Sequence, residues 1–113
     1  NNSPVDIYLG TGGAPEGVLA AAALSCYGAQ MQTRLIVDEV SIIRAKKMGI
    51  TDIKKKYNIN EMVKGDVMFC ATGVTDGDLV EGIKDLNTNY KASTYALHKD
   101  QKIAKKITNT HKK

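Results

Sequence analysis

The sequence predicts an α/β protein, a layered sandwich with a partly parallel sheet. The main observation is that apolar runs rich in β-forming residues alternate with segments whose apolar residues recur at helical spacing, an order typical of α/β domains. A second observation concerns size. With 113 residues, 42% of them hydrophobic and 25% charged, the chain has the composition of a globular protein and the length of one domain. We therefore expect residues 1–113 to form a single α/β domain.

The first predicted elements are a strand and a helix joined by a turn. VDIYLG, residues 5–10, is rich in β-formers and is expected to be a buried strand. The glycine-rich turn GTGGAP leads into a helix over residues 15–27. Pro15 suits the first helical position, where a missing N–H costs nothing, and the alanine run 20–23 extends the helix at little entropic cost. Gly28 is a suitable stop.

The middle of the chain predicts a second strand and two helices. MQTRLIV, residues 31–37, alternates as a strand does. Asp38 can cap a helix over residues 39–48, which Gly49 would end. A loop and then a short helix led by Asn60 follow.

The last third begins with the clearest predicted strand. DVMFCAT, residues 66–72, reads as buried throughout, and a helix over residues 77–85 is expected after it, capped by Thr75 or Asp76. The end of the chain predicts two strands joined by the turn HKDQ.

Charge and cysteine content limit the classes of protein. The net charge is +4, with lysines crowded toward the end of the chain, which indicates a solvated face or an attraction for phosphate-rich partners. No run of about 18 apolar residues occurs, so no transmembrane helix is expected. Cys26 and Cys70 lie in apolar runs and are interpreted as small buried hydrophobic residues in a reducing cytosol.

The stretch GTGGAPEG predicts a site at the start of the first helix. Unpaired N–H groups and the helix dipole attract anions there, and Gly12 and Gly13 let a ligand approach the backbone. Glu16 would repel a bound phosphate unless a divalent cation lay between the two, so a Mg²⁺ or Mn²⁺ ligand is one interpretation of Glu16. The alternative is that Glu16 only stabilises its helix through the dipole or a bond to the cap backbone.

A second acidic cluster lies in ATGVTDGDL, residues 71–79. Asp76 and Asp78 follow a predicted strand, where α/β sheets build sites, and are candidate pocket residues together with Gly12. Helix capping by Thr75 or Asp76 is the alternative interpretation of this cluster and the one that the pattern favours.

The sequence pattern leaves two other functions possible. The predicted order resembles the opening of a dinucleotide-binding oxidoreductase module: a strand, a GxG turn, a helix, a second strand and then Asp38. However, Pro15 stands where the third glycine of that motif belongs. A non-catalytic basic module that binds nucleic acid has little beyond charge in its favour.

Three stretches together resemble one enzyme family. YLGTGGAPEGVLAAAALSCYGAQMQTRL, RAKKMGI and DVMFCATGVTDGDLVEGI are similar to the class II fructose-1,6-bisphosphatases of bacteria. The resemblance covers residues 5–98 approximately and corresponds to the last third of that family. It implies the C-terminal half of a sugar-phosphatase fold with αβαβα layers, and hence a piece of a longer phosphatase.

The resemblance also implies an activity and a site. The family uses Mn²⁺ or Mg²⁺ to remove the 1-phosphate of fructose 1,6-bisphosphate, giving fructose 6-phosphate in gluconeogenesis, and some members accept sedoheptulose 1,7-bisphosphate. Glu16 would be a metal ligand and Gly13 would contact substrate through its backbone. The other metal carboxylates lie upstream in the family, so we expect the chain to be inactive alone and assign it no catalytic residue. Expected partners are the N-terminal part of the same enzyme and further copies in a cytoplasmic homo-oligomer, with no nucleic acid and no membrane.

Overall fold

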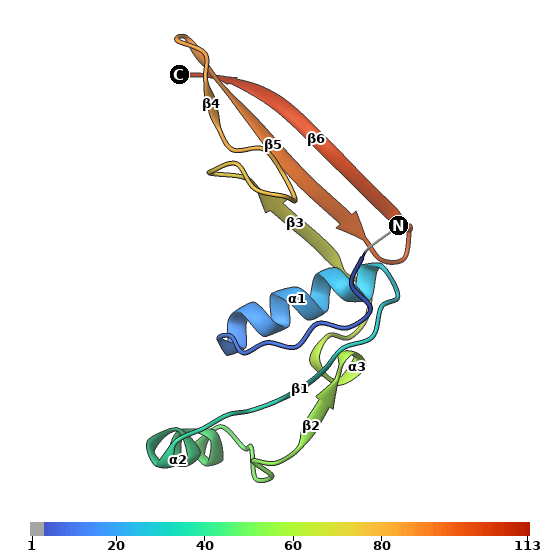
Figure 1. Cartoon of the computed structure of the whole chain (residues 1–113), viewed down its shortest axis with the longest axis vertical. Helices are drawn as coiled ribbons and strands as arrows, with labels where there is room; N and C mark the ends of the chain where they lie inside the picture. The colour runs from blue at the N-terminus through green and yellow to red at the C-terminus, as the bar shows by residue number, and fades with distance from the viewer. Residues whose placement is uncertain (1–3) are drawn as a thin grey trace.

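The computed structural model describes residues 4–113, in which helices and antiparallel strands form two separate sheets around a central helix (Figure 1). The helices are α1 (Ala14–Cys26), α2 (Glu39–Lys47) and α3 (Ile59–Met62). The strands are β1 (Gln32–Arg34), β2 (Lys56–Asn58), β3 (Met68–Thr72), β4 (Lys84–Asp85), β5 (Asn89–His98) and β6 (Ile103–Lys112).

Helix α1 confirms the predicted helix at both ends. Gly13 is the N-cap residue, so Ala14 is the first helical residue and Pro15 is the second, one position later than predicted. At the other end, the Gly28 N–H donates to the Ser25 carbonyl (3.2 Å) and the Ala29 N–H to the Leu24 carbonyl (3.1 Å). Gly28 has a φ of +67°, a left-handed conformation that glycine adopts without steric cost, which explains why the helix ends there.

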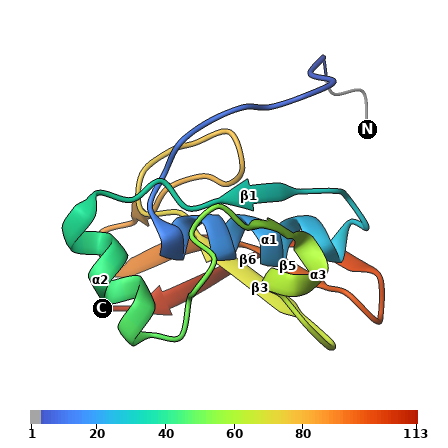
Figure 2. The same ribbon diagram turned by 90° about the horizontal axis from the view of Figure 1, so that it is seen from below.

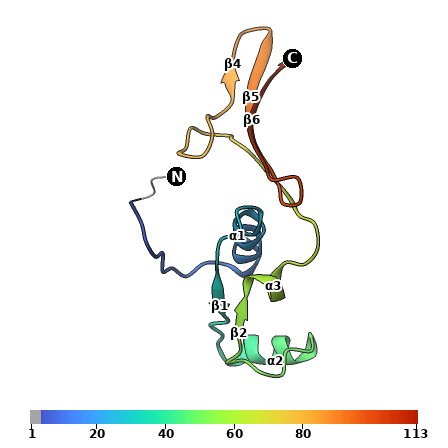
Figure 3. The ribbon, with the colours of Figure 1, turned by 90° about the vertical axis from the view of Figure 1, so that its right-hand side faces the viewer.

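Helix α1 lies between the two sheets. Figure 3 shows the strands β4, β5 and β6 on one side of α1, and β1, β2 and α3 on the other. Viewed from below, β1 runs alongside α1, and α3 lies in front of the C-terminal end of α1 (Figure 2). Ala21 is fully buried and Ser25 is 8% exposed, so small side chains let both neighbours approach the helix closely.

The smaller sheet pairs β1 with β2 and is followed by the shortest helix. Its antiparallel register runs from Gln32 opposite Asn58 to Arg34 opposite Lys56. The Asn58 side chain accepts from the Glu61 N–H (3.1 Å), while Glu61 accepts from the Asn58 N–H (3.0 Å). This capping box starts α3 directly after Asn58, earlier than the predicted start.

The predicted cap of the second helix is confirmed. The Asp38 side chain accepts from the Ser41 N–H at 2.8 Å, and α2 follows it. Gly49, with a φ of +85°, closes the helix.

The larger sheet is built on the long hairpin β5–β6, which confirms the predicted pair of strands. The hairpin register is continuous from Asn89 opposite Lys112 to His98 opposite Ile103. Strands β3 and β4 pair with different stretches of β5 along its other edge.

The partly parallel sheet and the sandwich layers are not confirmed. Every strand pair in residues 4–113 is antiparallel. One reason is that the predicted strand at residues 5–10 is wrong: the segment is extended but belongs to neither sheet. Ile7, Tyr8 and Leu9 are 74%, 86% and 84% exposed. A strand forms only against a neighbouring backbone, and neither sheet supplies one here.

The predicted helix at residues 77–85 is also wrong. Residues 73–83 form a loop and β4 follows. The Ile83 N–H donates to the Val74 carbonyl (3.1 Å), which folds the segment back on itself. A Cβ on Gly82 would stand 2.5 Å from the Thr75 carbonyl carbon, so the glycine permits a close backbone approach that a helix would prevent.

The burial predicted for residues 66–72 holds on one face of β3 only. Phe69 and Ala71 are half-buried, whereas Met68 is 72% exposed. The interpretation of Cys70 as a buried residue is wrong, because it is exposed, while Cys26 is partly buried.

Candidate functional site

The start of α1 brings together Gly12, Gly13 and Glu16, all exposed. The α1 helix begins at Gly13, whose carbonyl accepts from the Gly17 N–H at 3.0 Å. The Glu16 carboxylate turns back over this glycine: its Oε2 atom lies where a Cβ on residue 13 would stand. Glycine at position 13 is therefore what lets the carboxylate cover the end of the helix.

This arrangement matches both interpretations of Glu16. A carboxylate in the first turn stabilises a helix through its dipole. The same carboxylate, being exposed, also presents oxygen atoms at a helix end whose N–H groups attract anions. A Cβ on Gly12 would meet nothing within 4 Å, so the backbone beside Glu16 is open to a ligand.

The structure does not join the second acidic cluster to this site. The Asp76 carboxylate accepts from the Gly82 N–H (2.8 Å) and from Lys84 Nζ (2.9 and 2.8 Å). The Lys84 bond, followed by the Gly82 bond, lowers the pKa of Asp76. Asp76 thus holds its own loop in shape, and Asp78 is exposed in the same loop.

The described residues fit a metal ion only in part. Within residues 4–113, no group of three or more His, Cys, Asp or Glu side chains is placed to hold one. Glu16 fits as a single oxygen ligand, and a metal site here would need further ligands from outside these residues.

The dinucleotide interpretation loses its structural context. That fingerprint requires a strand immediately before the glycine turn. Residues 5–10 form no strand in the structure.

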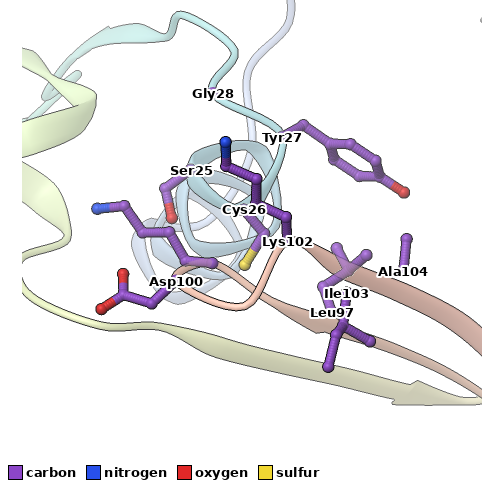
Figure 4. Close-up of a pocket in the computed structure, with 10 residues that line it drawn as sticks. Ser25, Cys26, Tyr27, Gly28, Leu97, Asp100, Lys102, Ile103 and Ala104 are labelled. Carbon is purple, nitrogen blue, oxygen red and sulfur yellow. The ribbon is translucent and has the colours of Figure 1, made fainter.

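A hollow lies elsewhere, between the end of α1 and the β5–β6 turn (Figure 4). Its volume is about 880 Å³, and Cys26, Tyr27, Leu97 and Lys102 are among its lining residues. Gly12, Gly13, Glu16, Asp76 and Asp78 are not among them. Sequence reasoning missed this hollow, because its two walls are some 70 residues apart in the chain and no local pattern marks them.

Two side-chain contacts anchor α1 beside this hollow. The Tyr27 hydroxyl hydrogen-bonds to the Tyr95 hydroxyl, which raises the pKa of Tyr27 to about 12. The Cys26 thiol donates to the Val67 carbonyl with a sulfur–oxygen distance of 3.6 Å. Both contacts are structural and join α1 to the larger sheet.

His98, the last residue of β5, pairs with an aspartate. His98 Nε2 and Asp66 Oδ2 are 2.6 Å apart, and the Asp100 N–H donates to Asp66 Oδ1 at 3.2 Å. The hydrogen bond between His98 and Asp66 raises the pKa of His98 and lowers the pKa of Asp66. In the antiparallel register Met68 lies opposite His98, which brings Asp66, two residues before Met68, close to the His98 side chain. The sequence gives no sign of this contact until the pairing of β3 with β5 is known.

None of the helices in the described part of the chain is both long and apolar enough to cross a membrane.

Comparison with known proteins identifies the family. The profile described as bacterial fructose-1,6-bisphosphatase, glpX-encoded, matches residues 1–111. A Synechococcus sp. (strain JA-3-3Ab) protein named D-fructose 1,6-bisphosphatase class 2/sedoheptulose 1,7-bisphosphatase is 33% identical over 100% of this chain and 37% of its own length. The Escherichia coli (strain K12) fructose-1,6-bisphosphatase 2 class 2 is 36% identical over 82% of this chain and 33% of its own length.

The match runs along nearly the whole chain but along a minor part of each relative. The chain spans little more than a third of the length of these curated relatives. Because the family profile covers almost every residue, this chain belongs to the bacterial, glpX-encoded family of class II fructose-1,6-bisphosphatases.

Proposed function

We propose that this chain supplies one metal ligand, Glu16, and part of the substrate pocket, Gly13, to a phosphatase. The assembled enzyme hydrolyses the 1-phosphate of fructose 1,6-bisphosphate to give fructose 6-phosphate, a step of gluconeogenesis. The observation that carries the proposal is the family match over residues 1–111, within which an exposed carboxylate covers the start of a helix. The names of the relatives also make sedoheptulose 1,7-bisphosphate a candidate substrate.

The start of α1 has the chemistry that a phosphate ester requires. The unpaired N–H groups of the first turn and the helix dipole stabilise negative charge on phosphoryl oxygens. Gly12 and Gly13 carry no side chain to keep the phosphate away from these N–H groups. Glu16 would be one of the residues that hold a Mn²⁺ or Mg²⁺ ion, and such an ion, when bound, would polarise the phosphoryl group and lower the pKa of an attacking water. The positive charge of that ion would offset the repulsion between the Glu16 carboxylate and the phosphate.

The chain alone is proposed to be inactive. One carboxylate cannot hold a catalytic metal ion, and no larger group of metal-binding side chains occurs in residues 4–113. The missing ligands would come from the other two-thirds of the phosphatase, so residues 1–113 act as one unit of a longer cytoplasmic enzyme that forms a homo-oligomer.

The test is Glu16→Gln in the assembled phosphatase. The substitution keeps the shape of the side chain but removes its charge. Because a metal ion supplies several kcal/mol of charge stabilisation, we expect a loss of roughly 100-fold or more in phosphate release. Glu39→Gln is the matched control, since Glu39 is also the acidic residue in the first turn of its helix, α2. Full activity of Glu16→Gln at saturating Mn²⁺ would remove Glu16 from the metal site.

A further inference from the structure

Helix α1 is held along its second half and exposed along its first. Within the described part of the chain, residues 14–16 and 18–20 are exposed, and Leu19 is 58% exposed. From residue 21 to residue 26 the helix is buried or half-buried: Ala21 is fully buried and Ser25 is 8% exposed. Glu16 therefore stands at the end of the helix that the described residues do not hold.

Two side-chain bonds join the held half of α1 to the larger sheet. The Tyr27 side chain extends from the end of α1, and its hydroxyl bonds to the Tyr95 hydroxyl of β5 (Figure 4). The Cys26 thiol donates to the Val67 carbonyl, 3.6 Å away. The same carbonyl accepts from the Lys99 N–H at 2.8 Å, a bond that extends the pairing of β3 with β5. Both partners of α1 thus belong to the paired backbone of the sheet.

Tyr95 is the better fixed of the two partners. It lies opposite Ala71 of β3 and opposite Lys106 of β6, so its strand is paired on both edges. Backbone pairing on both sides leaves the residue little freedom to move. The bond to Tyr95 raises the pKa of Tyr27 to about 12, so Tyr27 stays protonated at neutral pH. The Tyr95 hydroxyl is therefore a fixed point against which the end of α1 is held.

The length of α1 makes Glu16 sensitive to this fixed point. Glu16 and Tyr27 lie about 16 Å apart along the helix axis, at about 1.5 Å per residue. Residues 18–26 contain no glycine and no proline, the residues at which helices usually kink. The helix therefore turns as a rod, and a tilt of about 4° at Tyr27 moves Glu16 by about 1 Å. A displacement of about 1 Å at a reacting centre can cost about 100-fold in rate.

We propose that Tyr95 is a positioning residue for Glu16. Its hydroxyl fixes the end of α1 on β5, and the rigid helix then sets where the Glu16 carboxylate stands. The inference rests on the proposed function, which names Glu16 as a metal ligand but does not say what holds α1 in place. The competing explanation is that the Tyr27–Tyr95 bond adds stability and nothing else.

Tyr95→Phe and Thr94→Val form a matched pair of variants. Each removes one hydroxyl from β5 and keeps most of the side chain. The Thr94 Oγ1 atom bonds to Thr72 Oγ1 at 2.8 Å, which is also a hydroxyl–hydroxyl bond of the larger sheet. Thr94 precedes Tyr95 on the same strand, so its side chain lies on the opposite face of the sheet. A loss of stability alone should therefore affect both variants, whereas a turn of α1 should occur only in Tyr95→Phe.

The first measurement is the orientation of α1 in residues 1–113. Residual dipolar couplings of the backbone N–H groups report the angle between α1 and the β5–β6 hairpin. In Tyr95→Phe, we expect the α1 axis to turn, or to sample a wider range, by about 4° or more, while the hairpin couplings stay as in the parent. In Thr94→Val, we expect the parent orientation. An α1 orientation in Tyr95→Phe that equals the parent orientation overturns the proposal.

The second measurement is Mn²⁺ binding in a chimera in which this chain replaces the matching segment of the Escherichia coli relative. Titration followed by electron paramagnetic resonance of free Mn²⁺ gives the affinity, and phosphate release gives the rate. We expect Tyr95→Phe to need about fivefold more Mn²⁺ for half-saturation, equivalent to the roughly 1 kcal/mol of one hydrogen bond. Saturating Mn²⁺ should restore the rate. Lost stability would instead lower the amount of active enzyme and leave the half-saturation unchanged.

The two proposals can fail separately. Equal Mn²⁺ half-saturation in Tyr95→Phe and Thr94→Val overturns the positioning role, even where Glu16→Gln in the same chimera loses Mn²⁺ affinity as the proposed function requires. Unchanged Mn²⁺ affinity in Glu16→Gln counts against the proposed function, and the couplings then still show whether Tyr95 orients α1. The couplings also decide by themselves where the chimera does not fold.

Discussion

Leu97→Ala is expected to be among the most damaging single substitutions in this chain. Leu97 is 2% exposed and lies on β5 between Phe69 of β3 and Ala104 of β6. Replacing a buried leucine by alanine costs about 2–5 kcal/mol, the larger values applying where the cavity cannot collapse. Few apolar residues in positions 4–113 are buried: Ala21, Ala45, Val67, Val80 and Leu97. Leu97 is the largest of these, so we expect a loss of about 3 kcal/mol, a large part of the roughly 5–15 kcal/mol that stabilises a typical domain.

Urea unfolding followed by far-ultraviolet circular dichroism measures this loss directly. Ile107→Ala is the matched control, because Ile107 is a β-strand residue of similar size that is 41% exposed. It should cost less than about 1 kcal/mol in the free chain. The comparison would refute the packing described for α1 and β5 if Leu97→Ala destabilised the chain no more than Ile107→Ala does.

Two further predictions concern the loop and the histidine pair. Gly82→Ala should lower stability by about 1–3 kcal/mol in urea unfolding, since a Cβ there would stand 2.7 Å from the Asp76 backbone nitrogen. Gly77→Ala, whose Cβ would meet only the Val80 carbonyl at 3.9 Å, should be nearly neutral, and equal effects would contradict the tight loop. The raised pKa of His98 contributes stability that is complete below about pH 6.5 and is lost as the pH rises through the pKa of His98 in the folded chain. The lowered pKa of Asp66 contributes stability that is complete above about pH 4 and is lost as the pH falls through the pKa of Asp66 in the folded chain. The contribution of the pair should therefore peak between about pH 4 and 6.5, and a His98→Asn variant with the same pH profile as the parent would exclude it.

Local signals in the sequence predicted the elements whose formation depends on local bonds. Gly28 ends α1 in a left-handed conformation, Asp38 caps α2, and the β5–β6 hairpin forms across the predicted turn. In each case the decisive interaction joins residues a few positions apart, so a short stretch of sequence contains all of its parts.

The wrong predictions concern segments whose structure their own composition does not determine. Residues 5–10 have strand composition but lie against neither sheet, and the segment predicted as a helix after Asp76 is a loop closed by Gly82 and Lys84. The composition of a segment shows how much apolar surface it could bury. It does not show which other part of the chain lies against that segment.

The candidate site divides in the same way. Local sequence is enough to identify the family and the residues that begin α1, because a short motif and an N-terminal helical turn are local features. The folded chain, in contrast, shows that Asp76 holds its own loop, that His98 contacts Asp66, and that Leu97 is buried on one face of the β3–β5–β6 sheet while Met68 is exposed on the other. The Asp76 bonds depend on the way the loop folds back to Gly82 and Lys84. The His98–Asp66 contact and the covering of one sheet face depend on strand register and on contacts between residues far apart in the chain. Such contacts are set by the packing of the whole chain, so no single stretch of the sequence predicts them.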